Sequence, residues 1–259
     1  MLIADSVTVK GRHEQLVPPT SLSVQRGEVH LVVADPQISR TALALALSGR
    51  MQPTSGTVAW GHSEALKTLR RHSALLDSPQ VNEPESHMKV RDVVGEDLAL
   101  IPGPIWRKPR TKKWISEHGF DDVAADWVDA IDPARRLELQ LLLAAENPHV
   151  QMLVLDSPDR HDLHDESWMD LLTEFASSPR EFAVVAIVSG IPCDWDGPVS
   201  YLGPLPEQPE EETPEETGFD GFVQEELDLD LPEPTSQVPV IDQPASEEPA
   251  AETSEAKDN

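Results

Sequence analysis

Cysteine is almost absent from this sequence of 259 residues. The single Cys193 excludes a disulfide within the chain and any metal site built on a pair of cysteines. Two histidines, His161 and His164 in "HDLHD", follow His149, but their spacing fits no zinc pattern. We therefore expect a solvated loop at 161–165 and assign no chemistry to Cys193.

Long apolar runs are also missing. The longest candidate, "LELQLLLAA" (137–145), contains Glu138 and Gln140 and is far shorter than the roughly 18 apolar residues that a membrane span needs. The opening "MLIADSVTVKGR" lacks the basic, apolar and small-residue order of a secretion signal. These absences predict a cytoplasmic protein that reaches the inner face of a membrane only through a partner.

Basic residues are scarce. The chain has 20 Lys and Arg against 47 Asp and Glu, a net charge of −27 that disfavours nucleic acid as a ligand. Residues 207–259 alone hold 18 acids, one base and seven prolines, which leaves −10 for 1–206. Such a composition cannot offset the entropy of ordering, so we expect one domain at 1–206 and a disordered acidic tail at 207–259. Within the tail, "GFDGFVQEELDLDLP" (218–232) also suits a segment that orders on a basic, apolar groove of a partner.

Apolar patterning along 1–206 alternates between strands and helices. Buried strands are expected at 150–156 and 182–189, where runs of Val, Leu and Ile are typical of parallel sheets covered on both faces. Other strands are expected at 2–9, at 21–33 with a turn at 26–28, at 53–60 and at 72–76. Helices are expected at 40–48 and 165–177, and over most of 90–146 with a proline-rich interruption at 101–110. The helix at 134–146, Trp127 and Trp168 are assigned to the core. The pattern predicts an α/β fold.

Glycine is missing from the one loop that most needs it. In "VVADPQISRTALALALSG" (32–49), an apolar strand leads through a short irregular stretch into an apolar helix, as in phosphate-binding loops. Glycines in such loops let the backbone turn through positive φ and approach a phosphate closely. Here the loop holds Asp35, a carboxylate, Pro36, which has no N–H, and the β-branched Ile38.

Two longer stretches resemble the ATP-binding cassette (ABC) ATPase domain. "SLSVQRGEVHLVV" with "RTALALALSGRMQPTSGTVAW" resembles the region around that family's phosphate loop, and "AAENPHVQMLVLDSPDR" (144–160) its second nucleotide motif. The resemblance covers about 1–203 in order and spacing. It implies a P-loop NTPase-like, mainly parallel sheet with an antiparallel edge, and a helical subdomain at about 85–140.

The resemblance also assigns site residues. The phosphate loop would run from Ala34 to Thr41, with Ser39, Arg40 and Thr41 at the phosphates, and with Thr41 and Asp156 on the magnesium side of bound ATP. A simpler alternative is a helix start in which Arg40 is a solvated cation and Thr41 a hydroxyl cap, while Asp156 caps a loop. With the glycines lost, the sequence predicts weak ATP and magnesium binding at most.

Other family positions have departed as well. Ser157 stands where the water-polarising glutamate is expected, and a serine cannot act as a general base there. Gly190 stands at the position of the family's switch histidine, and Val9 at the position of the aromatic residue that stacks on adenine. The stretch "VDAIDP" (128–133) stands at the position of the family's signature loop. The linking glutamine would fall within 75–85, where neither Ser78 nor Gln80 matches convincingly. No residue is therefore assigned a catalytic role.

Three functions follow as hypotheses. The first is a non-hydrolytic ABC-like subunit that acts as a cytoplasmic scaffold or regulator of an integral membrane protein, with cassettes pairing as homo- or heterodimers. "VNEPESHMKVRDVV" resembles cassettes that accompany membrane proteins of the YhgE/Pip type. The second is an ATP-hydrolysing transporter subunit, and the third an adaptor acting through its acidic tail. The basic run "RKPRTKK" (107–113) lies between Trp106 and Trp114 and has three interpretations. It is a solvated helix flank, or it contacts anionic lipid headgroups or a cytoplasmic loop of a membrane partner, or it binds the acidic tail of the same chain.

Overall fold

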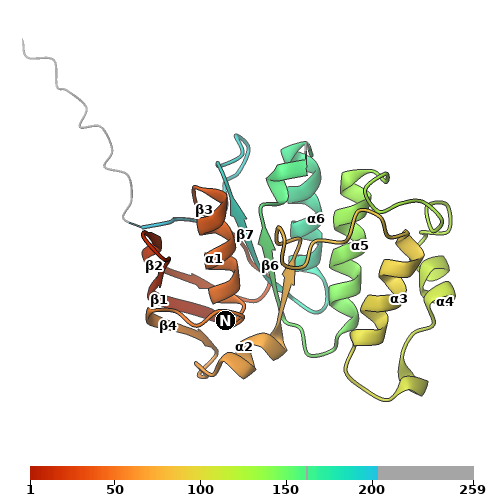
Figure 1. Ribbon diagram of the computed structural model, residues 1–259, viewed down its shortest axis with the longest axis horizontal. Coiled ribbons are helices and arrows are strands. Elements are labelled where there is room, and N and C mark those ends of the chain that lie inside the picture. Colours follow the sequence, from red (N-terminus) through yellow and green to blue (C-terminus); the bar gives the residue numbers. More distant parts are fainter. Residues whose placement is uncertain (162, 204–259) are drawn as a thin grey trace, which may run out of the picture. The chain divides into compact units, whose positions relative to one another are not determined.

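The computed structural model describes residues 1–161 and 163–203, so the tail predicted at 207–259 lies outside the described residues. Figure 1 shows two small sheets and the helices that cover them. The strands are β1 (Leu2–Lys10), β2 (Gln15–Val24), β3 (Val29–Val33), β4 (Ser55–Trp60), β5 (Ser73–Leu76), β6 (Met152–Asp156), β7 (Ala183–Val188) and β8 (Val199–Tyr201). The helices are α1 (Gln37–Leu47), α2 (Leu66–His72), α3 (Val90–Leu100), α4 (Thr111–Glu117), α5 (Pro133–Glu146) and α6 (Asp165–Ser177), with 3-10 turns η1 (Ile105–Arg107) and η2 (Pro158–His161).

The first sheet is antiparallel, in the order β2-β1-β4. Strand β2 contains Pro18 and Pro19, which have no N–H for a strand ladder, and it lies at the edge of this sheet. The predicted stretch 21–33 is therefore two elements, because the chain turns at Gly27, with φ of +80°, between β2 and β3. The antiparallel edge expected from the sequence is confirmed as a sheet of its own.

The second sheet is parallel, in the order β5-β6-β7-β3-β8. Every residue of β6 and β7 is buried, as their unbroken apolar runs predict. Alternate side chains enter two different cores: Val154 and Val185 pack on the side of α1, while Leu153 and Val184 pack on the side of α6. The predicted α/β class with a mainly parallel sheet is thus confirmed.

Helices α3, α4 and α5 share a third core. Leu139 and Leu143 of α5 face this core, whereas Leu137 and Leu141 of the same helix face the parallel sheet and α6. The four-residue spacing places each pair on one face of the helix. Figure 1 accordingly shows α5 lying between α6 and the α3–α4 pair.

Two expectations need correction. Helix α1 begins at Gln37, three residues before the predicted start, so most of the expected phosphate loop is helical. Trp168 is fully buried, but Trp127 is 49% exposed, so its assignment to the core is wrong. The Lys89 ammonium lies 5.4 Å from the centre of the Trp127 ring, over its face. Across the described residues, none of the helices combines the length and apolar character needed to cross a bilayer.

Candidate functional site at the carboxyl edge of the parallel sheet

Strands β3, β5 and β6 all end at the same edge of the parallel sheet. In open α/β folds this edge is where ligands bind, because loops from neighbouring strands converge there. The tripeptide Leu-Asp-Ser occurs at the ends of two adjacent strands, at 76–78 after β5 and at 155–157 on β6, and Leu76 pairs with Leu155. Asp77 and Ser78 therefore lie close to Asp156 and Ser157.

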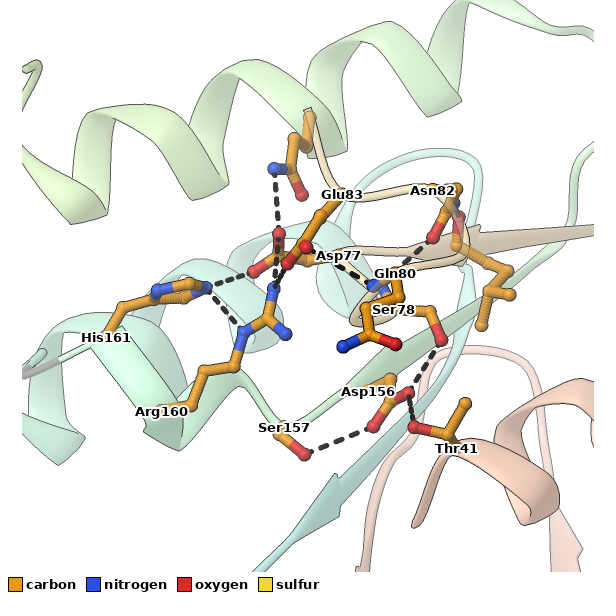
Figure 2. A network of polar contacts seen from close by, with 12 residues as sticks. Thr41, Asp77, Ser78, Gln80, Asn82, Glu83, Asp156, Ser157, Arg160 and His161 are labelled. Carbon is orange, nitrogen blue, oxygen red and sulfur yellow. Dashed lines mark hydrogen bonds and ion pairs between the residues drawn. The ribbon is translucent and has the colours of Figure 1, made fainter. Parts of the chain in front are cut away.

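Asp156 is the centre of the site and is fully buried. Its Oδ2 accepts hydrogen bonds from the hydroxyls of Thr41 and Ser78, each at 2.7 Å. Its Oδ1 accepts from Gln37 Nε2 at 2.9 Å and from the Ser157 hydroxyl at 3.1 Å. Figure 2 shows the Thr41, Ser78 and Ser157 hydroxyls pointing at this carboxylate from three different segments. The carboxylate is saturated by neutral donors of the protein itself.

Arg40 fills the space beside this carboxylate. Its side chain is only 11% exposed, and it donates to Gln37 Oε1 from Nη2 at 2.7 Å and to the Ala34 carbonyl from Nη1 at 2.9 Å. A further bond joins Arg40 Nε to the Ser157 hydroxyl at 2.9 Å. The alternative of a solvated cation at Arg40 is therefore wrong, because burying a guanidinium requires the partners seen here.

The start of α1 uses its own amides. The N–H groups of Ser39 and Arg40 both donate to the Pro36 carbonyl, at 2.9 and 3.3 Å, and the Ser39 residue is buried. Thr41 does not cap the helix, because the N-cap residue is Pro36 and its side chain makes no cap hydrogen bond. Phosphate loops work by aiming such amides at the anion. The loop between β3 and α1 thus lies where the sequence predicts a phosphate-binding loop, and two amides of its helix bond to a carbonyl of the chain itself.

The groups that the resemblance assigns to magnesium-bound ATP bond to other groups of the chain. Magnesium takes hydroxyl, carboxylate and water oxygens together with phosphate oxygens, in octahedral geometry at about 2.0 to 2.1 Å. Here the Thr41 hydroxyl and Asp156 bond directly to each other, and Gln37 and Arg40 occupy the space on the helix side. The exposed Asp35 carboxylate, 3.4 Å from Arg40 Nη1, adds a negative charge where phosphates would arrive. A nucleotide would have to displace these side chains.

Three further positions that the resemblance assigns to the nucleotide hold Ser157, Val9 and Gly190. Ser157, with φ of +61°, links Arg40 to Asp156 and also donates to Gln37 Oε1 at 2.8 Å. Val9 is 4% exposed within the core of the antiparallel sheet and offers no face to a base. Gly190 is exposed and faces open space. None of the three supplies a group for hydrolysis.

The region expected to hold the signature loop ends in a capped helix. The Asp132 carboxylate accepts from the N–H groups of Ala134 and Arg135, at 2.9 and 3.2 Å, and Pro133 occupies the first turn of α5. Here a carboxylate of the same chain already uses its free amides.

Sequence reasoning missed a second cluster beside the first. Asp77, almost fully buried, contacts Nε2 of His161, and Arg160 Nη2 lies 3.0 Å from both Asp77 and Glu83. Figure 2 shows His161 and Arg160 reaching Asp77 from η2. Burial raises the pKa of Asp77, but the hydrogen bond from His161 and the charge of Arg160 outweigh burial and hold this pKa below its usual value.

Ser78 follows Asp77 in the chain and connects the two clusters through the bond from its hydroxyl to Asp156. Its N–H donates to Asn82 Oδ1 at 2.9 Å. The doubtful match at 75–85 therefore does reach the site, through Ser78 and not through Gln80. The repeated Leu-Asp-Ser is the signal in the sequence that could have indicated this cluster. The histidines 149, 161 and 164 do not converge: His149 lies 3.4 Å from Arg71 and His164 precedes α6. Over 1–161 and 163–203 no three His, Cys, Asp or Glu side chains gather as a metal site.

The fold is that of ABC-type ATP-binding cassettes. A putative ABC transporter ATP-binding protein from Pyrococcus furiosus has a TM-score of 0.57 at 14% identity, covering 78% of this chain and 96% of its own. A dimeric cassette, MJ0796 with ADP and Pi, has a TM-score of 0.58 at 17% identity, covering 78% and 94%. The cbiO1 protein from Clostridium perfringens, part of the cbiONQ transporter complex, has a TM-score of 0.54 at 14% identity, covering 72% and 78%. No family model and no curated protein matches the sequence. At these identities the likeness concerns the fold.

Proposed function

We propose that this chain is a degenerate ABC-type cassette that does not hydrolyse ATP and serves as a cytoplasmic scaffold or regulator in a membrane protein complex. The observation that carries this proposal is the closed network of Arg40, Gln37, Thr41 and Asp156 at the place of the nucleotide phosphates. The fold around this network is that of a cassette, and the chemistry of the loop is among the features that have been replaced.

The loss of catalysis follows from the groups that are missing. Removing one preorganised donor to a developing charge costs about 3 to 4 kcal/mol of transition-state stabilisation. Here the glycine cradle, the glutamate at Ser157 and the histidine at Gly190 are replaced together. Arg40, Thr41 and Asp156 remain, and their polar atoms bond to other groups of the protein.

The kind of partner is proposed from the fold. A permease-like integral membrane protein, contacted at the inner face of the membrane, is the partner proposed here, and pairing with a second cassette is proposed with it. The similar structures support both ideas, because one is part of a transporter complex and another is dimeric. The YhgE/Pip type of membrane protein remains our more specific proposal for the partner.

The direct test is a thermal melt of the full chain with and without about 1 mM Mg-ATP. A ligand at 100 times its Kd adds about 2.7 kcal/mol, which is several degrees for a domain of this size. We expect a change below about 1 °C, because the network already occupies the site.

Arg40→Ala is the matched variant for this melt. A clear stabilisation of the wild type that disappears in Arg40→Ala would show that the loop holds nucleotide and would overturn the closed-site proposal. An ATPase assay completes the test. Hydrolysis above background that Asp156→Ala abolishes would favour the alternative of a working transporter subunit.

A further inference from the structure

The connection between α3 and α4 concentrates positive charge in an acidic protein. Five of the 20 Lys and Arg residues fall within 107–113, and no acid occurs from 98 to 116. Lys113 pairs with Glu117 at 3.2 Å, and Lys108 donates to the Ala99 carbonyl at the end of α3. The remaining three bases, Arg107, Arg110 and Lys112, are exposed and form no ion pair with any residue that the structure describes.

Large apolar side chains are exposed at the same place. Trp106 is 85% exposed and Leu100 is 80% exposed, the two highest values among the large hydrophobic residues of the described chain. Burying these groups in water-free surroundings would be favourable, so their exposure indicates an interaction surface. We define the 100–113 patch as Leu100, Trp106, Arg107, Arg110, Lys112 and Lys113.

The patch rests on a fixed base. Trp114 is 1% exposed and its indole Nε1 donates to Glu146 on α5 at 2.7 Å, while its N–H bonds to the Arg110 carbonyl at 2.9 Å. Lys108 ties the same segment back to the last turn of α3. Figure 1 shows the connection passing beyond the end of α3, on the side away from the parallel sheet. Trp106 is therefore presented outward by a held loop.

We propose that the 100–113 patch binds the surface of an anionic lipid bilayer directly. Tryptophan favours the boundary between headgroups and hydrocarbon, and Lys and Arg near it are attracted by anionic headgroups. Leu100 separates this occupant from nucleic acid, since an aliphatic side chain gains from acyl chains and not from phosphates. A protein partner would need a matching pocket for the protruding Trp106, whereas a bilayer accepts it without one.

The acidic excess of the chain does not forbid this contact. At physiological salt the Debye length is about 8 Å, so charges elsewhere on the protein are largely screened at the patch. The acid-free interval 98–116 keeps repulsive charges out of the segment itself. The proposal is independent of whether the cassette holds nucleotide.

The test is co-sedimentation of the full chain with vesicles of phosphatidylcholine containing about one-third phosphatidylglycerol, compared with phosphatidylcholine alone. We expect binding to the anionic vesicles at about 0.05 M salt and its loss at about 0.5 M. The triple variant Arg107→Gln, Arg110→Gln and Lys112→Gln should bind about a hundredfold more weakly, because each base near the surface contributes about fivefold. Trp106→Ser should weaken binding about tenfold.

Matched controls separate the patch from general charge. Lys10→Gln, Arg12→Gln and Lys67→Gln remove the same charge from exposed sites elsewhere, and Trp127→Ser removes another exposed indole. Both controls should bind like the wild type. Failure of the wild type to bind anionic vesicles at low salt would overturn the proposal and favour an acidic protein surface as the occupant. Equal losses in the patch and control variants would overturn it as well.

Discussion

Asp156 is a buried carboxylate whose negative charge is shared among four neutral donors. Arg40 does not contact it directly but bonds to Gln37 and Ser157, which do. Arg40 therefore stabilises the carboxylate indirectly, through the side chains of Gln37 and Ser157. These groups lie in a low-dielectric site, where such hydrogen bonds are strong. This arrangement gives Asp156 a structural role that needs no metal.

The first prediction concerns this role. Asp156→Ala should lower the free energy of unfolding by about 3 kcal/mol, because it leaves the buried donors of Thr41, Ser78 and Gln37 without their acceptor. Urea unfolding in nucleotide-free buffer measures the change. Asp122→Ala, at an exposed aspartate, should change stability by less than about 0.5 kcal/mol. If both variants were equally stable, the network would not support the fold.

Helix ends show how elements that resemble nucleotide-binding motifs have been put to structural use. Helix α1 begins without a side-chain cap, and the N–H groups of Ser39 and Arg40 donate to the Pro36 carbonyl. Helix α5 begins with Asp132, whose side chain takes two amides, followed by Pro133 at a position where a missing N–H costs nothing. The start of α5 therefore has none of these amides free for an anion.

The second prediction tests the cap. Asp132→Ala should destabilise the protein by about 1 kcal/mol, because the N–H groups of Ala134 and Arg135 lose their acceptor. Asp132→Asn keeps an acceptor oxygen and should recover most of this loss. Tm measurements on the three proteins suffice. If Asp132→Asn lowered Tm as much as Asp132→Ala, the charge of Asp132, and not its hydrogen bonding, would be what matters at this helix start.

Elements with strong local signals could be predicted from the sequence. Strands β6 and β7 are unbroken apolar runs, and α6 has one apolar face with Trp168 at its centre. The site could be predicted only in part: Thr41 and Asp156 do meet, but the closure by Gln37 and Ser78 depends on how three loops pack together. Side-chain closure of this kind has no period or spacing in the sequence. The prediction for Trp127 was wrong for a similar reason, since its 49% exposure follows from the packing of its loop and not from a local pattern.

For the whole molecule, the cassette architecture is independent of the loop that gives such cassettes their chemistry. Three apolar cores hold the described residues together, and α5 belongs to two of them through opposite faces. None of these cores needs a glycine in the β3–α1 loop or a bound phosphate. The fold is therefore retained while its surfaces are free to take a different role.

The charge of the whole molecule opposes its compactness. The chain carries −27, and residues 1–203 still hold 29 acids against 19 bases, because 204–206 are uncharged and the remaining 18 acids and one base follow. Such an excess destabilises a folded state through self-repulsion. Helix α6 shows the effect locally: Glu166, Asp170 and Glu174 are exposed at four-residue spacing, and the helix contains no Lys or Arg.

The third prediction uses this stripe. Asp170→Lys should replace two repulsive pairs by two attractive ones and raise the free energy of unfolding by about 1 kcal/mol at low salt, or Tm by about 3 °C. Asp170→Asn, which only removes the repulsion, should give about half of this gain. Because the pairs are exposed, about 0.5 M salt should reduce the gain of both variants and stabilise the wild type relative to low salt. A gain in Asp170→Lys that is the same at both salt concentrations would show that helix propensity, and not charge, limits the stability of α6.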